Sequence, residues 1–182
     1  MPPAGLNFRK SPFPLRQQLA RLGWQIFCRI FIRLSPRPCH GWRALCLRAW
    51  GARLGAGCRI YPGAIIWAPW NLECAADVCV GDGAEIYNPA PIRLGERAVI
   101  SQGAFLCTTS HDYTKAIFPL VMQAITVGAD AWVGARAIVL PGCDIGEGSV
   151  VGAGSVVTRS TPAWSVCAGN PCRVIREGYS RS

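Results

Sequence analysis

The sequence holds only two histidines, His40 and His111. A neutral imidazole with a pKa of about 6.5 can take a proton from a hydroxyl group near neutral pH, and His111 is the candidate for such a general base. Cys107 and Ser110 precede it closely and are alternatives as acylated nucleophiles, although both stand where a small side chain is wanted for packing alone. His40 matches no catalytic pattern and is expected to be a solvated turn residue.

Ten cysteines are spread along the chain without a C-x-x-C pair, so their spacing predicts no metal site. The thiols are expected to be free and mostly buried, as in a reducing compartment. Arginines interrupt every apolar run well short of the ~20 residues that a membrane span needs, and they leave no clean signal peptide. The predicted location is the cytoplasm.

The net charge of +9 is concentrated at one end. No acidic residue precedes Glu73, and residues 1–72 hold 11 basic ones, whereas residues 73–182 hold 8 basic against 10 acidic residues. A uniformly basic domain would indicate a nucleic-acid protein. The uneven distribution indicates a basic attachment segment joined to a nearly neutral body, so nucleic acid is not the expected partner.

The body of the chain repeats with a period of six residues. An aliphatic residue recurs at this spacing, and the residue four positions later is almost always Ala, Ser, Cys or Thr. The aliphatic positions are Leu54, Ile60, Ile66, Leu72, Val80, Ile86, Leu94, Ile100, Leu106, Val127, Val133, Val139, Ile145, Val151 and Val157. A period of six fits neither the helical period of about 3.6 nor the strand period of 2, so each hexad is predicted to be a short strand plus a turn.

Three hexads close one triangular coil, and the repeat therefore predicts an all-β solenoid, a parallel β-helix of about five coils. Glycines after the aliphatic residues are expected to supply backbone freedom at tight corners. Two-residue offsets at 78–80 and 92–94 are interpreted as corner insertions. Residues 112–126 keep no hexad phase, and an insertion projecting from a rigid solenoid is where a site is normally built.

Several stretches carry a family signature: Val127-Gly-Ala-Asp-Ala-Trp-Val-Gly, Ile145-Gly-Glu-Gly-Ser-Val-Val-Gly and Gly169-Asn-Pro-Cys-Arg-Val-Ile-Arg-Glu. They are similar to the hexapeptide-repeat O-acetyltransferases of maltose, galactosides and nodulation factors. Gly41-Trp-Arg-Ala-Leu together with Ile100-Ser-Gln-Gly-Ala-Phe-Leu-Cys-Thr-Thr-Ser-His-Asp resembles more narrowly the colanic acid biosynthesis acetyltransferases. The resemblance covers roughly residues 33 to 177 and implies the left-handed form of the β-helix, an exception to the right-handed crossover rule.

The resemblance implies an enzyme that uses acetyl-CoA as acetyl donor, with His111 as base and direct transfer in a ternary complex. In this family acetyl-CoA lies beside the last coils, with its phosphates on basic residues. The matching cofactor-binding positions are Trp132, Ala135, Ala153, Thr158, Arg159, Arg173 and Arg176.

Asn88 and Asp112 are candidates for positioning the acceptor. Asp112 could instead orient the imidazole of His111, although adjacent side chains of an extended segment point apart and a backbone carbonyl is an equal alternative. Asn88 could equally be a turn residue before Pro89.

Three regions are expected: a basic N-terminal arm over 1–52, a β-helix over 53–168 with a catalytic loop at 111–126, and a C-terminal tail over 169–182. Helices are predicted at 17–34 and 42–50. The arm is expected first to form a helical cap over the open first coil. Peripheral contact with an anionic inner membrane surface, bringing the enzyme to a lipid-linked sugar, is an added expectation.

The predicted function is O-acetyl transfer from acetyl-CoA to a sugar hydroxyl in exopolysaccharide or other cell-surface glycan biosynthesis. The alternative is a β-helix without catalysis that serves as a scaffold or, through its basic arm, as a nucleic-acid-binding subunit. The resemblance also implies a homotrimer, in which His111 of one subunit faces the 132–159 surface of the next.

Overall fold

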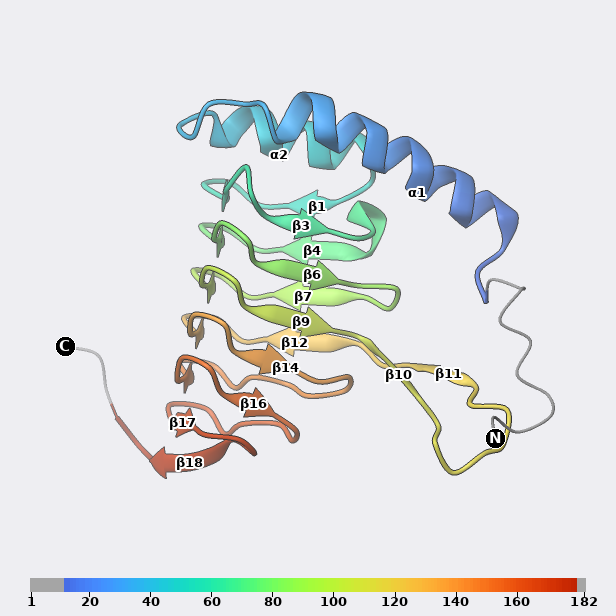
Figure 1. Ribbon diagram of the computed structural model, residues 1–182. Coiled ribbons are helices and arrows are strands. Elements are labelled where there is room, and N and C mark those ends of the chain that lie inside the picture. The colour runs from blue at the N-terminus through green and yellow to red at the C-terminus, as the bar shows by residue number, and fades with distance from the viewer. Residues whose placement is uncertain (1–11, 180–182) are drawn as a thin grey trace.

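Each hexad folds as a strand of two or three residues followed by a turn, and the coils stack into a triangular prism (Figure 1). The computed structural model describes residues 12–179. Face A of the prism is built from β1 (Arg53–Leu54), β4 (Leu72–Cys74), β7 (Ile92–Leu94) and β12 (Ile125–Val127). Face B contains β2 (Arg59–Ile60), β5 (Cys79–Val80), β8 (Val99–Ile100), β13 (Trp132–Val133), β15 (Val150–Val151), β17 (Val166–Ala168) and β18 (Arg173–Arg176). Face C contains β3 (Ile65–Ile66), β6 (Glu85–Tyr87), β9 (Phe105–Cys107), β14 (Ile138–Val139) and β16 (Val156–Val157).

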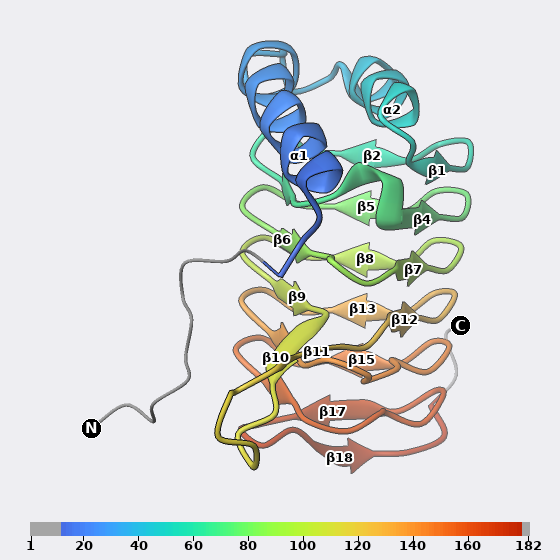
Figure 2. The same cartoon turned by 90° about the vertical axis from the view of Figure 1, so that its right-hand side faces the viewer.

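The strands within a face are parallel and in register, apart from the antiparallel β18 that closes the C-terminal end. On face B, Ile60, Val80, Ile100, Val133 and Val151 stack directly over one another and are buried. Seen from the cap, the chain runs counterclockwise from face A to B to C as it descends (Figure 2). The predicted parallel β-helix and its left-handed sense are therefore confirmed.

The solenoid has six coils, one more than the repeat predicted. Ile145 forms a bridge with Thr161, and Val151 pairs with Cys167 in the last coil. This coil was missed because Thr161 and Cys167 occupy positions where the search required an aliphatic residue. A hydroxyl or a thiol can occupy the aliphatic position in this last coil, because no further coil stacks on it and only β18 follows.

The first of the two corner insertions lies elsewhere than predicted, whereas the second falls between Ile86 and Leu94 as the repeat indicated. Cys74, not Leu72, pairs with Leu54 and with Leu94, so the two extra residues in each of the first two coils fall in the corner between faces C and A. In the first coil this corner holds the short 3-10 helix η2 (Pro69–Asn71). Leu72 is nevertheless buried, because β4 is long enough to pair it with Ile92.

The glycines after the aliphatic residues have a different role from the predicted one. A Cβ on Gly134 would lie 2.5 Å from the carbonyl oxygen of Val151 in the next coil, so close stacking requires the missing side chain there. Positive φ angles occur two residues further on, at Gly154 and also at Asp130 and Arg136. Backbone freedom is needed at that later position, and non-glycine residues also fill it.

Helices cover the open first coil. These are α1 (Leu15–Phe27), the π-helix η1 (Cys28–Ile32) and α2 (His40–Ala49). The indole Nε1 of Trp24, which is buried, donates a 2.7 Å hydrogen bond to the carbonyl of Ile66 on the edge strand β3. The helical cap that we expected is confirmed for the described residues, and it occupies the exposed strand edge.

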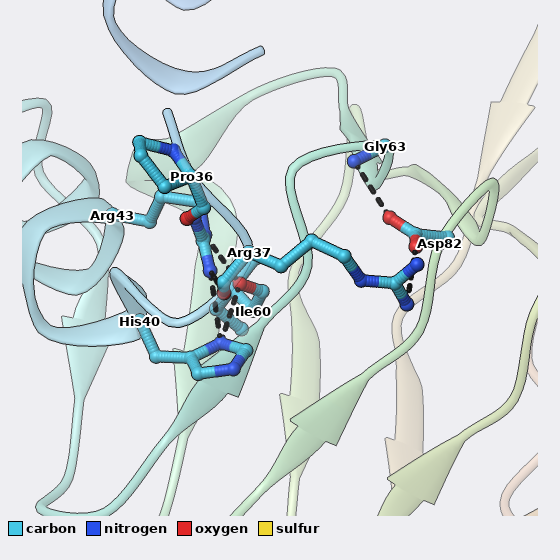
Figure 3. Close-up of polar contacts among 7 residues, drawn as sticks. All are labelled: Pro36, Arg37, His40, Arg43, Ile60, Gly63 and Asp82. Atoms are coloured by element: carbon cyan, nitrogen blue, oxygen red, sulfur yellow. Dashed lines mark hydrogen bonds and ion pairs between the residues drawn. The ribbon is translucent and has the colours of Figure 1, made fainter. Parts of the chain in front are cut away.

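A buried arginine joins the cap to the coils (Figure 3). The guanidinium of Arg43 donates to the carbonyl of Ile60 at 2.6 Å and to those of Pro36 and Arg37. His40, expected to be a solvated turn residue, is instead the half-buried first residue of α2, with its Nδ1 3.0 Å from the Ile60 carbonyl oxygen. That expectation was wrong because α2 begins directly over β2.

Within residues 12–179, we find no helix long and apolar enough to cross a bilayer. All ten cysteines lie in this part of the chain and are free. Burial raises the pKa of seven of their thiols, which keeps them neutral at physiological pH. The seven are Cys28, Cys46, Cys58, Cys74, Cys79, Cys143 and Cys172.

Candidate active site

A hairpin arm projects from the prism at the corner between faces C and A (Figures 1 and 2). Its strands are β10 (Thr109–His111) and β11 (Leu120–Met122), which pair antiparallel, with His111 opposite Leu120. The arm interrupts the hexads because it leaves the third coil after β9 and rejoins the fourth at β12. His111 thus stands where the regular strand pairing of the arm ends and its terminal turn begins.

The imidazole of His111 is exposed and, within the described part of the chain, is held by one hydrogen bond. Its Nδ1 lies 2.8 Å from the carbonyl oxygen of Phe118, across the turn of the arm. A carbonyl oxygen can only accept, so Nδ1 carries the proton and Nε2 presents its lone pair. Among the described residues, none forms a hydrogen bond with Nε2, which is therefore free to take a proton from a substrate hydroxyl.

Asp112 does not contact the imidazole. Its carboxylate accepts hydrogen bonds from the backbone N–H and hydroxyl of Thr114 at 3.1 and 2.6 Å and pairs with Lys115 at 3.3 Å. The Thr114 bonds hold the pKa of Asp112 below its usual value. The residue closes the turn that carries the Phe118 carbonyl, and Phe118 itself is held at a φ of 46°. Of the two expected partners for His111, the structure places a backbone carbonyl there.

Asn88 is fully buried and has no free polar atom for a sugar. Its Oδ1 accepts from the backbone N–H of Ala68 at 2.9 Å, and its Nδ2 donates to the carbonyl of the same residue at 2.8 Å. Asn71 in turn donates to the carbonyls of Asn88 and Pro89. The acceptor role expected of Asn88 is not supported, because this side chain ties together two successive turns at the corner between faces C and A.

The residues expected to bind acetyl-CoA are distributed around the prism. Trp132 lies on face B, with its Nε1 donating 2.7 Å to Ser101 Oγ. Ala135 and Ala153 form stacked turns between faces B and C, where Gly154 N–H donates to the Ala135 carbonyl. Face B lies opposite the corner that carries the arm (Figure 2). One chain therefore does not bring Trp132 to His111.

Two of the predicted arginines do come together. Arg159, which follows Thr158 at the exposed corner after β16, lines one pocket with Arg173 of β18. The same pocket, at the C-terminal end of the prism, is also lined by Ser160, Thr161 and Cys172. Arg176 stands at the far end of β18, opposite Val166. Because two arginines line it, the pocket between Arg159 and Arg173 is positively charged and suited to binding a phosphate group.

Comparison with known proteins fits this architecture. Residues 124–159 match the family model described as bacterial transferase hexapeptide (six repeats). Over 157 residues the chain is 41% identical to the "Putative colanic acid biosynthesis acetyltransferase WcaF" of Escherichia coli (strain K12), and the match covers 86% of each protein. The chain belongs to the hexapeptide-repeat acetyltransferases.

Solved structures of other hexapeptide-repeat acetyltransferases share the fold. A maltose O-acetyltransferase from Clostridium difficile 630 superposes with a TM-score of 0.80 at 21% identity, covering 92% of this chain and 90% of its own. A hexapeptide-repeat acetyltransferase from Vibrio cholerae, complexed with acetyl coenzyme A, gives a TM-score of 0.80 at 22% identity, with coverages of 92% and 91%. The cap and six coils are thus an arrangement that other proteins of this kind adopt.

The two alternative nucleophiles of this acetyltransferase are not joined to its histidine. Cys107 Sγ donates to the carbonyl of Thr109 at 3.2 Å, and Ser110 alternates with His111 along β10, which points the two side chains to opposite sides. No hydrogen bond between either residue and His111 is found in the described chain. This geometry favours direct transfer over an acyl-enzyme.

An aromatic column was missed by the sequence analysis. On the outer side of face C, the ring centroids of Phe13 and Trp67 lie 5.1 Å apart, those of Trp67 and Tyr87 5.7 Å, and those of Tyr87 and Phe105 6.4 Å. The guanidinium of Arg21 lies 3.9 Å over Trp67. The column runs from the cap to β9, directly before the arm. Its signal in the sequence was an aromatic residue repeated after one 20-residue coil, at 67 and 87.

Proposed function

We propose that this acetyltransferase moves an acetyl group from acetyl-CoA to a sugar hydroxyl during the synthesis of a cell-surface polysaccharide. The supporting observation is His111, whose tautomer leaves Nε2 free at an exposed arm. The donor is supported by the acetyl coenzyme A complex of the Vibrio cholerae protein, and the glycan context by the name of the Escherichia coli relative.

In the proposed reaction, Nε2 of His111 removes the proton of the hydroxyl as its oxygen attacks the thioester carbonyl carbon. A C–O bond forms and a tetrahedral intermediate results; the C–S bond then breaks, and the imidazolium returns its proton to the sulfur of CoA. The Phe118 carbonyl, which accepts from Nδ1–H, stabilises the positive ring in between. Each proton and electron pair is accounted for without a further reagent.

Release of CoA from acetyl-CoA in the presence of a panel of sugars tests this function. We expect release that depends on one class of acceptor, with mass spectrometry showing the sugar heavier by one acetyl group. Hydrolysis of the thioester at the same rate with every sugar, or with none, would contradict it.

We also propose that the enzyme is a homotrimer. The arm exposes apolar residues that nothing else in residues 12–179 covers: Tyr113 is 81% and Ile117 63% exposed. Face A carries an ion-paired ladder in which Glu73 binds Arg53 at 3.0 Å and Arg93 at 3.5 Å. The other two faces each carry one charged position in the first coils, Arg59 on face B and Glu85 on face C. Toward the C-terminal end their ladders are apolar and run Val99, Trp132, Val150, Val166 on face B and Ile138, Val156 on face C. This asymmetry suits a neighbouring subunit against faces B and C.

The pocket between Arg159 and Arg173 is proposed to hold a phosphate of acetyl-CoA. Arg159→Gln and Arg173→Gln should each raise the KM for acetyl-CoA about tenfold, as expected for loss of one charge-assisted hydrogen bond. The KM for the acceptor should not change. Arg53→Gln, which removes an exposed arginine on face A, is the matched control and should leave both constants unchanged. Equal effects of all three variants would show that only general charge matters.

The aromatic column is proposed to hold the apolar face of the acceptor sugar beside the arm. Tyr87→Ala should raise the KM for the acceptor about tenfold while leaving that for acetyl-CoA unchanged, because a stacking surface is lost at one substrate only. Tyr61→Ala is the control, since Tyr61 is a half-buried tyrosine that packs on His40 away from the column. An unchanged acceptor KM for Tyr87→Ala would exclude this role.

A cytoplasmic location with peripheral contact to the inner membrane surface completes the proposal. The ten free thiols fit a reducing compartment. A lipid-linked sugar at that surface is the acceptor that such an enzyme would meet.

A further inference from the structure

The outer side of the helical cap carries a row of exposed apolar side chains. They are Leu15, Leu19, Leu22, Ile26 and Ile30, each more than half exposed. At ~100° per residue, the four on α1 fall within about 60° of one another, and the buried Trp24 lies on the opposite side of the helix. The row therefore points away from the coils.

The second helix widens this row. Trp42 and Leu45 are exposed on α2, whereas Ala44 and Leu47 are buried toward the coils. Trp42 Nε1 donates a 2.9 Å hydrogen bond to the carbonyl of Phe31, which joins α2 to η1. Both views show α1 and α2 together across the N-terminal end of the prism (Figures 1 and 2). The outward sides of α1, η1 and α2 form one apolar surface, called here the cap face.

Basic groups accompany the cap face and acidic groups do not. Arg16, Arg29, Arg33 and Arg48 are exposed on or directly after the same helices. The first acidic residue anywhere in the chain is Glu73. An apolar row with cations and without anions matches the interface of a bilayer that contains anionic headgroups, where apolar side chains enter the acyl boundary and arginines meet phosphates.

We propose that the cap face docks the enzyme on an anionic lipid bilayer. The inference gives a surface to the membrane contact within the proposed function, because α1 begins on the side of the prism from which the arm projects (Figure 1). A lipid-linked sugar would then approach His111 along the aromatic column. In a cyclic trimer with its axis along the prism, three cap faces lie at one end and bind the same bilayer together.

Co-sedimentation with lipid vesicles tests docking without any acetyl transfer. The full chain should bind vesicles made of phosphatidylcholine with about one third phosphatidylglycerol, and added salt should weaken that binding. Leu22→Ser combined with Ile26→Ser should lower the partition coefficient roughly 10²-fold, since each exposed side chain buried in lipid is worth about tenfold. Both side chains face outward, so the variant keeps its core.

Matched controls separate the cap face from general stickiness. Ile175→Ser removes an apolar side chain that is 67% exposed on β18 and should not change vesicle binding. Arg29→Gln with Arg33→Gln should reduce binding to anionic vesicles only, whereas Arg93→Gln on face A should not. CoA release with a soluble sugar should be the same for the Leu22→Ser, Ile26→Ser variant as for the native chain.

Several results would overturn the inference. Undiminished vesicle binding by the Leu22→Ser, Ile26→Ser variant would place the contact elsewhere, for example in residues 1–11. A change in oligomeric state with that variant, without vesicle binding by the native chain, would assign the cap face to a second copy. Loss of CoA release for every variant and the native chain would count against the proposed function, while vesicle binding would still decide docking.

Discussion

Replacing His111 by alanine lowers turnover by ~10²-fold or more and leaves the fold intact. A general base contributes this much to a transfer step, which corresponds to about 2.7 kcal/mol or more in the activation barrier. His111 is exposed, so its removal leaves no cavity in the core. Within the described chain, the variant loses one hydrogen bond, from Nδ1 to the Phe118 carbonyl.

The measurement is the rate of CoA release at saturating acetyl-CoA and acceptor, with the thermal midpoint as a check on folding. Ser110→Ala is the matched control, because Ser110 is an exposed neighbour on β10 whose side chain points the other way. It should keep nearly full turnover. A His111→Ala protein that is folded and as fast as the native enzyme would remove His111 from the mechanism, and a Ser110→Ala protein without activity would bring the acyl-enzyme back.

The repeat predicted the architecture because stacking imposes the same demand on every coil. Ile60, Val80 and Ile100 must each fill the same interior column, and a period of six follows from that requirement. The same reasoning missed the sixth coil, since Thr161 and Cys167 satisfy the geometry of the column without the chemistry that the search demanded. The predicted register of β4 was wrong for a related reason. Leu72 and Cys74 are both buried on this strand, and the aliphatic pattern favoured Leu72, which has the larger side chain.

The site was predictable only where its chemistry is local. His111 could be chosen because it is rare and stands at a break in the repeat, but its partner is a carbonyl seven residues later that exists only once the arm has turned. For Asn88 the sequence left two roles open, positioning the acceptor or shaping a turn. The structure supports the second role, because the backbone of Ala68 uses both polar atoms of the side chain. Contacts between successive coils lie about 20 residues apart and leave little trace in local sequence.

The cap illustrates a third limit. Helical periodicity groups Leu22 and Ile26 on one side of the helix, yet it could not tell which side of the helix meets the coils. Trp24 decides this, because its indole reaches the carbonyl of Ile66 and turns the aliphatic row toward the outside. The outward row is thus a consequence of one tertiary hydrogen bond together with the edge that the cap must cover.

Mixing two inactive variants restores activity if the site is shared between subunits. One chain carries His111→Ala; the other carries Ala153→Trp, which places a bulky side chain at the exposed turn where acetyl-CoA is proposed to lie. Each homotrimer should be inactive. In an exchanged equal mixture, about a quarter of the interfaces pair an intact histidine with an intact turn, so about a quarter of the native activity should return.

The reason for expecting rescue is the position of the arm. His111 leaves the prism at the corner between faces C and A, whereas Trp132 lies on face B and Ala153 at its border with face C. One chain does not bring these groups together; in the proposed trimer the arm of a neighbour would reach them, and its exposed Ile117 would be covered there. Mass-tagged chains verify that subunits have exchanged. Two results would place the whole site within one subunit. One is an active protein that has the mass of a single chain by light scattering, and the other is a fully exchanged mixture without rescue.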